Sequence, residues 1–268
     1  MRLRLLFHTP ENGFVIPLNY NYYLTSIIYD SLKRASPEFS RFLHDKGYQD
    51  GFRSFKFFTY SQLRSEKREI KGNVIRFLSQ VEWFISSPTD DFILNFLNGV
   101  FETAGIKIGD KKLPLQNAEV LEPPKFSDKM KFKCLSPITI SRVDIVEGSG
   151  SPTSLPLDRY PRSQRVQHFI RPWESDLSEK ISQNLVRKFR LLYGKEPSNS
   201  SLKIELDSEY KSGRNIEKLV NFKGTNIKGF MSPFTVEGNP ELIEVGHETG
   251  FGDKNSMGFG MVEAKRDK

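Results

Sequence analysis

The feature that most constrains the fold of this 268-residue chain is the order of its predicted strands and helices, which runs through one series twice. Apolar residues that alternate favour strands, and apolar residues three or four positions apart favour helices. In the first half these patterns predict strand, helix, strand, strand, helix and strand. The segments are Arg2–His8, Asn19–Ala35, Phe55–Tyr60, Val81–Ser86, Asp90–Thr103 and Lys112–Glu122, with a short extra helix from Pro37 that Ser36 caps.

The same order returns after the proline pair Pro123-Pro124. The stretch between Glu147 and Arg165 is rich in Gly, Ser and Pro, which predicts a loop, and Asn221–Asn226 is typical of a further hairpin. The predicted segments are Met130–Ile140, Glu174–Tyr193, Leu202–Leu206, Lys228–Val236, a short helix from Asn239-Pro240 to about Gly246, and Met257–Glu263.

A βαββαβ series is the order of a ferredoxin-like module, in which helices cover one face of a four-stranded antiparallel sheet. Two tandem copies predict an α+β fold with an N-terminal domain over residues 1–124 and a C-terminal domain over residues 125–268. RNA-recognition modules share this topology, but the aromatic signature that they use to stack bases is not evident in the sequence.

Composition narrows the class of protein further. The formal net charge is +7, from 40 Lys and Arg against 33 Asp and Glu, and an excess of this kind favours polyanionic partners. Cys134 is the only cysteine, so an internal disulfide and a thiolate metal cluster are excluded. The apolar run after Met1 is too short for a signal peptide, and no window has the roughly 18 apolar residues of a membrane span. A cytoplasmic protein without membrane contact is therefore expected.

Three side chains are candidates for chemistry or ligand contact. On a helical wheel, Tyr20, Leu24, Ile27, Ile28 and Leu32 face the sheet, whereas Tyr29 falls on the polar side. In the next helix Phe39, Phe42 and Leu43 form the buried edge, which places His44 opposite them. Lys56 lies on one face of a predicted strand, with Phe55 and Phe57 on the other. Each also has a simpler interpretation, as a half-exposed tyrosine, a surface histidine or a solvated lysine at a strand edge.

The C-terminal segment Gly250–Gly260, "GFGDKNSMGFG", has four glycines in eleven residues, and we call it the glycine loop. One interpretation is a tight turn that glycine makes possible. The other is a surface that a sugar-phosphate backbone approaches closely enough to reach main-chain N–H groups. His247, at the start of this region, is a further candidate for ligand contact.

Taken together, these stretches resemble one family, the metal-independent CRISPR-associated endoribonucleases that cut precursor CRISPR RNA within its repeats. The matching stretches are "VIPLNYNYYLTSIIY" (Val15–Tyr29), "FLHD" (Phe42–Asp45), "KFFTYS" (Lys56–Ser61), "EKRE" (Glu66–Glu69), "LSPITI" (Leu135–Ile140) and "VGHETGFGDKNSMGFGMV" (Val245–Val262). The glycine-rich stretch is the most specific of these.

The resemblance implies two ferredoxin-like domains and a catalytic set of Tyr29, His44 and Lys56, with no cofactor and no metal. Lys46 or Arg53 is an alternative to Lys56, because the segment between histidine and lysine varies in length in this family. The residues that it implies for RNA binding are Gly250, Phe251, Gly252, Lys254, Asn255, Ser256, Gly258 and Gly260.

The implied reaction is attack by the ribose 2′-OH, which leaves a 2′,3′-cyclic phosphate and a 5′-hydroxyl. Histidine can act as acid or base near neutral pH, tyrosine suits proton donation, and lysine stabilises negative charge. CRISPR repeat RNA is the implied partner; other subunits of an interference complex and a homodimer are open alternatives. The rival interpretations are a non-catalytic RNA-binding subunit, and a metal-dependent nuclease or metabolic enzyme. Asp90-Asp91 fits the start of a helix better than a metal site.

Overall fold

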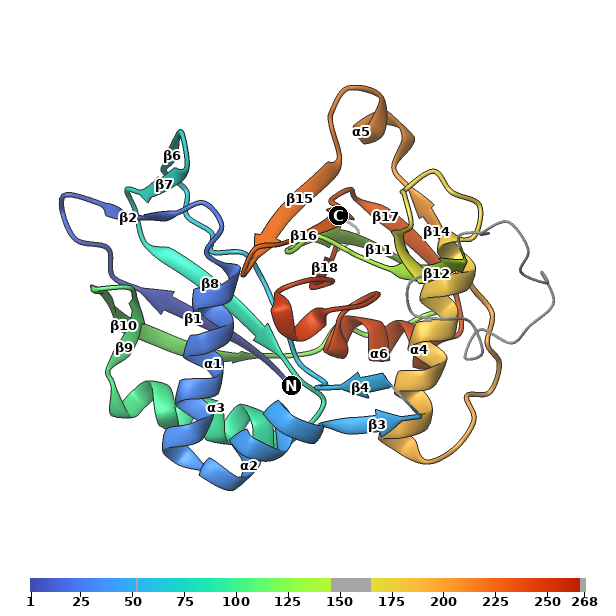
Figure 1. The fold of residues 1–268 in the computed structure, drawn as a ribbon, viewed down its shortest axis with the longest axis horizontal. Coiled ribbons are helices and arrows are strands. Elements are labelled where there is room, and N and C mark those ends of the chain that lie inside the picture. Colours follow the sequence, from blue (N-terminus) through green and yellow to red (C-terminus); the bar gives the residue numbers. More distant parts are fainter. Residues whose placement is uncertain (52, 146–164, 266–268) are drawn as a thin grey trace.

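The computed structural model describes residues 1–51, 53–145 and 165–265, and it shows two lobes that each contain an antiparallel sheet (Figure 1). The N-terminal sheet has the strand order β5-β8-β1-β10-β9, with helices α1 and α3 against it. Its elements are β1 (Arg2–Phe7), α1 (Asn21–Ala35), β5 (Thr59–Tyr60), β8 (Val81–Ser86), α3 (Asp90–Glu102), β9 (Gly105–Ile108) and β10 (Lys111–Leu121).

The C-terminal sheet has the strand order β14-β17-β11-β18, which is the arrangement of β5, β8, β1 and β10 in the first lobe. Its elements are β11 (Lys129–Cys134), α4 (Leu177–Tyr193), β14 (Leu202–Leu206), β17 (Phe234–Gly238), α6 (Pro240–Thr249) and β18 (Val262–Ala264). In each lobe the first strand of the series lies between the third and the fourth strands, and the second strand pairs with the third. Two ferredoxin-like modules are therefore confirmed.

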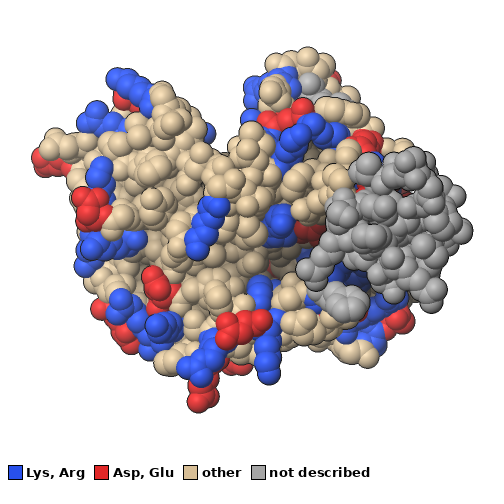
Figure 2. All heavy atoms as spheres, in the orientation of Figure 1, with Lys and Arg blue, Asp and Glu red and all other residues tan. Residues whose placement is uncertain are grey.

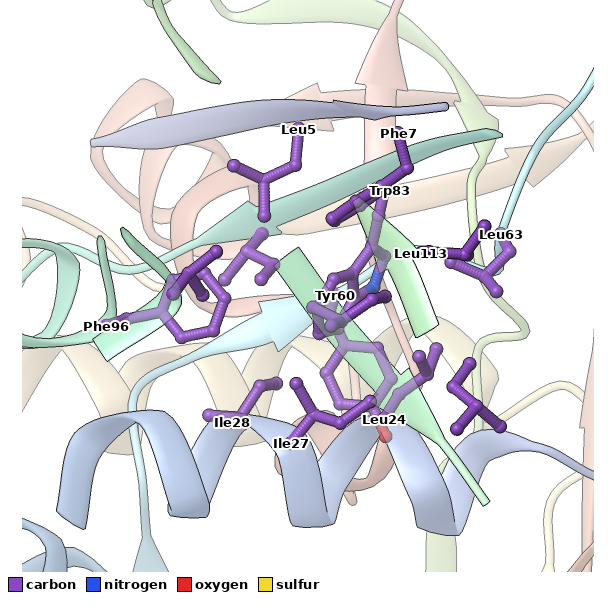
Figure 3. Close-up of a cluster of buried hydrophobic side chains, with 14 of the residues drawn as sticks. Leu5, Phe7, Leu24, Ile27, Ile28, Tyr60, Leu63, Trp83, Phe96 and Leu113 are labelled. Carbon is purple, nitrogen blue, oxygen red and sulfur yellow. The ribbon is translucent and has the colours of Figure 1, made fainter. Parts of the chain in front are cut away.

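The core of the N-terminal lobe lies between its sheet and its helices (Figure 3). The five residues that the helical wheel predicted to face the sheet, four in α1 and Tyr20 just before it, are all buried. Leu5 and Trp83 point from β1 and β8 toward α1, and Phe96 joins them from α3. Tyr60 packs edge-on against Trp83, with ring centroids 5.8 Å apart. This packing fixes α1 and the segment around Tyr60 relative to one another.

Several strands of the C-terminal lobe are shorter than predicted. Pro233 has no N–H to donate and divides the predicted Lys228–Val236 into β16 (Thr225–Phe230) and β17. The predicted Met257–Glu263 begins instead with a 3₁₀ turn, η4 (Asn255–Met257), and pairs only from Val262. The predicted Met130–Ile140 ends at Cys134, where Leu135 turns to the carbonyl of Met261. Helix α6 runs three residues past the predicted end at Gly246.

Hairpins account for most of the remaining structure. A hairpin is confirmed at Asn221–Asn226, where β15 (Glu217–Phe222) and β16 meet. The predicted loop after Glu147 lies outside the described residues, which resume at Arg165 with β13 (Arg165–Phe169). The other elements are β2 (Phe14–Pro17), α2 (Pro37–Arg41), η1 (Phe42–Lys46), β3 (Tyr48–Asp50), β4 (Arg53–Phe55), β6 (Arg68–Lys71), β7 (Val74–Phe77), β12 (Ser141–Ile145) and α5 (Ser208–Ser212).

The hairpin of β3 and β4 leaves the N-terminal lobe and reaches α4 of the C-terminal lobe (Figure 1). There Nε of Arg187 lies 3.8 Å from Oδ2 of Asp50. Among the described residues, no helix is both long enough and apolar enough to cross a membrane.

Candidate active site

Helix α1 positions Tyr29, whose ring is half-buried. The ring meets two aromatic neighbours edge-on, His44 with centroids 5.4 Å apart and Phe58 at 6.0 Å. Burial raises the pKa of the Tyr29 hydroxyl to about 12. The hydroxyl therefore keeps its proton at neutral pH, where it can donate a hydrogen bond but is a poor base.

His44 lies in η1, a single π-helical turn that continues from α2. Because a π turn is wider than an α turn, the helical wheel fails here, and Phe42 is exposed although the sequence predicted it to be buried beside Leu43. His44 is exposed as predicted, with 72 % of its side-chain surface open to solvent. Its Nδ1 lies 2.9 Å from Oδ1 of Asp45. A carboxylate at one ring nitrogen orients the imidazole and leaves the other nitrogen for proton transfer.

Lys56 follows the β3–β4 hairpin, and its ammonium donates a 3.0 Å hydrogen bond to the carbonyl oxygen of His44. The predicted strand Phe55–Tyr60 is wrong here, because Phe57 has a left-handed backbone (φ 49°) that separates β4 from β5. Burial lowers the pKa of the Lys56 ammonium, and the nearby carboxylate of Asp45 opposes this shift.

Gly47 makes this approach of Lys56 possible, although no pattern in the sequence had singled it out. It follows the π turn with φ 62° and ψ −160°, a conformation almost restricted to glycine. A Cβ at this position would lie 2.5 Å from the carbonyl oxygen of Phe55 and 3.0 Å from Nζ of Lys56. The glycine therefore allows β4 and Lys56 to pack directly against the end of η1.

The structure thus brings Tyr29, His44 and Lys56 together from three separate segments. The two alternatives to Lys56 lie elsewhere: Lys46 is exposed at the end of η1, and Arg53 lines a cavity beside the glycine loop. The hydrogen bond to the main chain of His44 favours Lys56. Which cation acts stays a prediction.

The glycine loop is packed more tightly into the protein than its composition suggested. All four of its glycines are buried and have φ between 79° and 90°. A Cβ on Gly252 would lie 2.3 Å from the carbonyl oxygen of Thr139, and one on Gly258 would lie 2.5 Å from the ring of Tyr60. The absent side chains therefore serve contacts within the protein. Phe251 is also fully buried, in the C-terminal core, and only the middle of the loop, Asp253–Met257, is partly exposed.

The N-terminal lobe holds one side of the glycine loop through α1 and β5. Nδ2 of Asn21 donates to the carbonyl of Met257 at 3.2 Å, and the hydroxyl of Thr25 donates to that of Ser256 at 3.3 Å. The hydroxyl of Thr59 donates to the carbonyl of Phe259 at 2.9 Å. Thr25 lies one helical turn before Tyr29, so one face of α1 contacts the loop and carries the candidate tyrosine.

Helix α4 holds the other side of the loop. The ammonium of Lys188 donates to three oxygens, the carbonyls of Gly250 and Gly252 at 2.7 and 3.0 Å and Oδ1 of Asn255 at 2.8 Å. Nδ2 of Asn184 donates to Oδ1 of Asp253 at 2.9 Å. Sequence reasoning missed Lys188. The available signal was a lysine on the apolar face of a helix, where its core neighbours lie at positions 181, 185 and 189.

A cavity of about 130 Å³ joins these parts. It lies between the segment that carries Lys56 and the middle of the glycine loop, and Arg53, Lys188 and Lys254 also line it. On the face of the molecule that Figure 2 shows, Lys and Arg side chains lie along the boundary between the two lobes. Tyr29 and His44 do not line this cavity, but Lys56 connects it to them through its hydrogen bond to the main chain of His44. The cations that line the cavity are suited to holding a polyanion.

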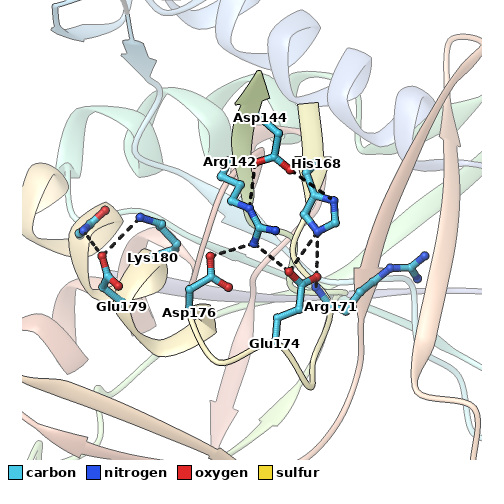
Figure 4. Close-up of polar contacts among 9 residues, drawn as sticks. Arg142, Asp144, His168, Arg171, Glu174, Asp176, Glu179 and Lys180 are labelled. Carbon is cyan, nitrogen blue, oxygen red and sulfur yellow. Dashed lines mark hydrogen bonds and ion pairs between the residues drawn. The ribbon is translucent and has the colours of Figure 1, made fainter. Parts of the chain in front are cut away.

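The other described histidines have different surroundings. His247 is buried beside Phe132 and does not face the loop's exposed middle; burial lowers its pKa well below the usual range. His168 belongs to an ion network that joins β12 and β13 to the start of α4 (Figure 4), where its Nε2 lies 2.8 Å from Oε1 of Glu174. The His168 hydrogen bond lowers the pKa of Glu174 to about 2. His8 is exposed. Within the described ranges, no three His, Cys, Asp or Glu side chains gather as a metal site would require.

Comparison with known proteins identifies the family of this two-domain fold. Residues 15–119 match the model of the CRISPR-associated protein Cas6 N-terminal region, and residues 121–264 match that of the Cas6 C-terminal region. The chain is 31 % identical to a CRISPR-associated endoribonuclease Cas6 of Methanocaldococcus jannaschii, over 100 % of this chain and 94 % of the relative. It is 28 % identical to the corresponding endoribonuclease of Pyrococcus furiosus, over 99 % and 90 %.

The fold agrees with this assignment. A solved structure of a Cas6-related gene product from Pyrococcus furiosus superposes with a TM-score of 0.81 at 24 % identity, over 100 % of this chain and 99 % of that one. The chain therefore belongs to the CRISPR-associated Cas6 family. The resemblance seen in the sequence is confirmed.

Proposed function

We propose that this protein is an endoribonuclease that binds CRISPR repeat RNA and cleaves precursor CRISPR RNA within the repeat. The observation that supports this most directly is the group of Tyr29, His44 and Lys56, of which Lys56 also lines the basic cavity beside the glycine loop. The family supports the same activity, because both relatives compared above are endoribonucleases by name.

In the proposed mechanism, a ribose 2′-OH attacks the adjacent phosphate and leaves a 2′,3′-cyclic phosphate and a 5′-hydroxyl. His44, exposed and oriented by Asp45, is the proposed proton-transfer group. Tyr29 keeps its proton at neutral pH and is proposed to donate a hydrogen bond to the phosphate or the leaving oxygen. Lys56 is proposed to stabilise the charge that develops on the phosphate.

The proposed RNA path runs over the partly exposed middle of the glycine loop. There Lys254 supplies charge, and Asn255 and Ser256 supply polar groups. The four buried glycines and Phe251 would act indirectly, by giving the loop its shape. We also propose a functional division at residue 124, with catalysis in residues 1–124 and the loop in residues 125–268. Other subunits of an interference complex and a homodimer stay predictions from the resemblance.

The decisive experiment uses repeat RNA in which deoxyribose replaces the ribose on the 5′ side of the scissile phosphate. This change removes the proposed nucleophile and leaves phosphate and base contacts in place. We expect the deoxy RNA to bind nearly as well as the parent and to stay uncut, and the parent RNA to be cut normally in EDTA.

The other reaction classes give different results in the same assay. A metal-dependent nuclease that activates water would cut the deoxy RNA and stop in EDTA. A non-catalytic RNA-binding subunit would bind both RNAs and cut neither. Cleavage of the deoxy RNA at the same phosphate would overturn 2′-OH attack.

A further inference from the structure

Lys188 occupies a place in α4 where an apolar residue is expected. It lies on the buried face of the helix with Leu185 and Phe189, and only 1 % of its surface is exposed. Burying an ammonium costs several kcal/mol of solvation, and a well-packed apolar residue of similar volume is often as stable or more stable in such a place. A lysine at this position therefore needs a reason other than stability of the core.

The contacts of the ammonium supply that reason. Its three donors are matched by three oxygen acceptors, and all three belong to the glycine loop. Two are main-chain carbonyls, of Gly250 and Gly252, at the point where the chain enters the loop. The third belongs to Asn255, whose Nδ2 in turn donates to the carbonyl of Phe259 at 3.0 Å, where the chain leaves the loop. Lys188 thus ties both limbs of the loop to one point on α4.

The surrounding charges agree with this arrangement. The charge of Asp253 acts on the ammonium, and this carboxylate is held by Asn184 from α4 and by the backbone N–H of Ser141 at 3.1 Å. The other cations that line the same cavity are Arg53, Lys56 and Lys254. The carboxylate of Asp253, within the loop itself, therefore favours the charged form of the buried Lys188, which burial disfavours.

We propose that Lys188 is a positioning residue that holds the exposed middle of the glycine loop, Asp253–Met257, in its RNA-binding conformation. This inference rests on the proposed function of the loop. Lys188 itself is buried and acts through the loop rather than by touching the substrate.

The test compares Lys188→Met, which keeps the length and apolar stem of the side chain, with Lys180→Met as a matched control. Lys180 lies on the same helix and pairs only with Glu179, at 3.3 Å, within the described structure. Hydrogen exchange without RNA is measured at the loop amides, including the Phe251 N–H that bonds to the carbonyl of Gly260. Thermal unfolding, the dissociation constant for repeat RNA and the cleavage rate at saturating enzyme are measured in parallel.

We expect Lys188→Met to stay folded, with faster exchange across the loop. RNA affinity should fall about tenfold or more, because a loop that is no longer held must be ordered when RNA binds. The cleavage rate at saturation should fall by less than the affinity does. Lys180→Met should match the parent in all four measurements. A Lys188→Arg variant that restores part of the protection and affinity would support the charge as the cause.

Parental exchange and parental affinity in a folded Lys188→Met variant would overturn the inference. A lower melting temperature together with faster exchange throughout α4, and not only in the loop, would also overturn it. Lys188 would then support the core rather than the loop. If the parent protein binds no repeat RNA, the proposed function fails. The exchange of the loop in the absence of RNA still decides whether Lys188 holds it.

Discussion

Replacing Gly47 with alanine should move Lys56 away from His44 without changing any of the candidate catalytic side chains. Gly47 has φ 62° and ψ −160°, and forcing a residue with a side chain into this region costs roughly 1–3 kcal/mol. The added Cβ would also lie 2.5 Å from the carbonyl oxygen of Phe55, which is main chain and cannot turn aside. β4 must therefore move away from η1, and Lys56 must move with it.

The expected loss follows from the bond that this movement breaks. The ammonium of Lys56 donates to the carbonyl of His44 at 3.0 Å, and a hydrogen bond from a charged donor is worth about 1.5–3 kcal/mol. If that bond places the ammonium at the phosphate, single-turnover cleavage should slow by about tenfold to hundredfold. Affinity for repeat RNA should change little, because the glycine loop is held by other contacts.

Gly51 provides the matched control for backbone strain. It too has a left-handed backbone, with φ 57°, but a Cβ there would meet nothing within 4 Å among the residues that the structure describes. Gly51→Ala should therefore lose some thermal stability and cleave at nearly the parental rate. The double variant Gly47→Ala, Lys56→Ala should be no slower than Lys56→Ala alone. A further slowing, or parental cleavage by a folded Gly47→Ala variant, would refute the reasoning.

Three other substitutions or conditions should have measurable effects. His44→Ala should slow single-turnover cleavage by about 10²–10⁴-fold with RNA affinity retained, and parental cleavage would exclude His44. Gly252→Val should weaken RNA binding in filter assays and lower the melting temperature, because its side chain meets the carbonyl of Thr139; unchanged affinity would make the loop a simple turn. Burial lowers the pKa of Lys188 to about 7, so between pH 7 and about 10 the unfolded chain binds more protons, and the free energy of unfolding should rise with pH by up to about 1.4 kcal/mol per unit relative to Lys188→Met. If the free energy of unfolding from urea titrations changes with pH in the same way for the parent and for Lys188→Met, this prediction is wrong.

Periodicity was sufficient to predict the framework but not the local breaks that shape the site. The apolar spacing of α1 correctly predicted its buried face and the polar side of Tyr29. The twofold βαββαβ order correctly predicted the four strands that the two sheets share, but not the fifth strand, β9, at the edge of the first sheet. The spacing failed at Phe42 because η1 is a π turn, and at Phe57 because its backbone is left-handed. Both breaks are changes of backbone conformation within a run of apolar residues, and apolar spacing carries no signal for such a change.

The glycine loop shows a different limit of sequence reasoning. Glycine predicts that something comes close to the backbone, but it does not say what. In the structure the neighbours are Thr139, Tyr60 and Asn255 of the same protein. The interpretation in which a sugar-phosphate backbone fills the space of the missing side chains is therefore not needed to explain the glycines. RNA contact is proposed instead for the partly exposed residues that they position.

Two segments of the N-terminal lobe each carry a candidate catalytic group, Tyr29 or Lys56, and also hold the glycine loop. Helix α1 bonds the loop through Thr25 and carries Tyr29 one turn later, and the segment after β4 carries Lys56 and bonds the loop through Thr59. A shift of the loop must therefore move or strain the elements that place the catalytic groups. Lys188 of α4 bonds the opposite side of the loop, so the loop is held by both lobes. We therefore expect substitutions in the loop to affect both RNA affinity and cleavage rate, whereas substitutions at His44, which does not contact the loop in the described structure, should affect the rate alone.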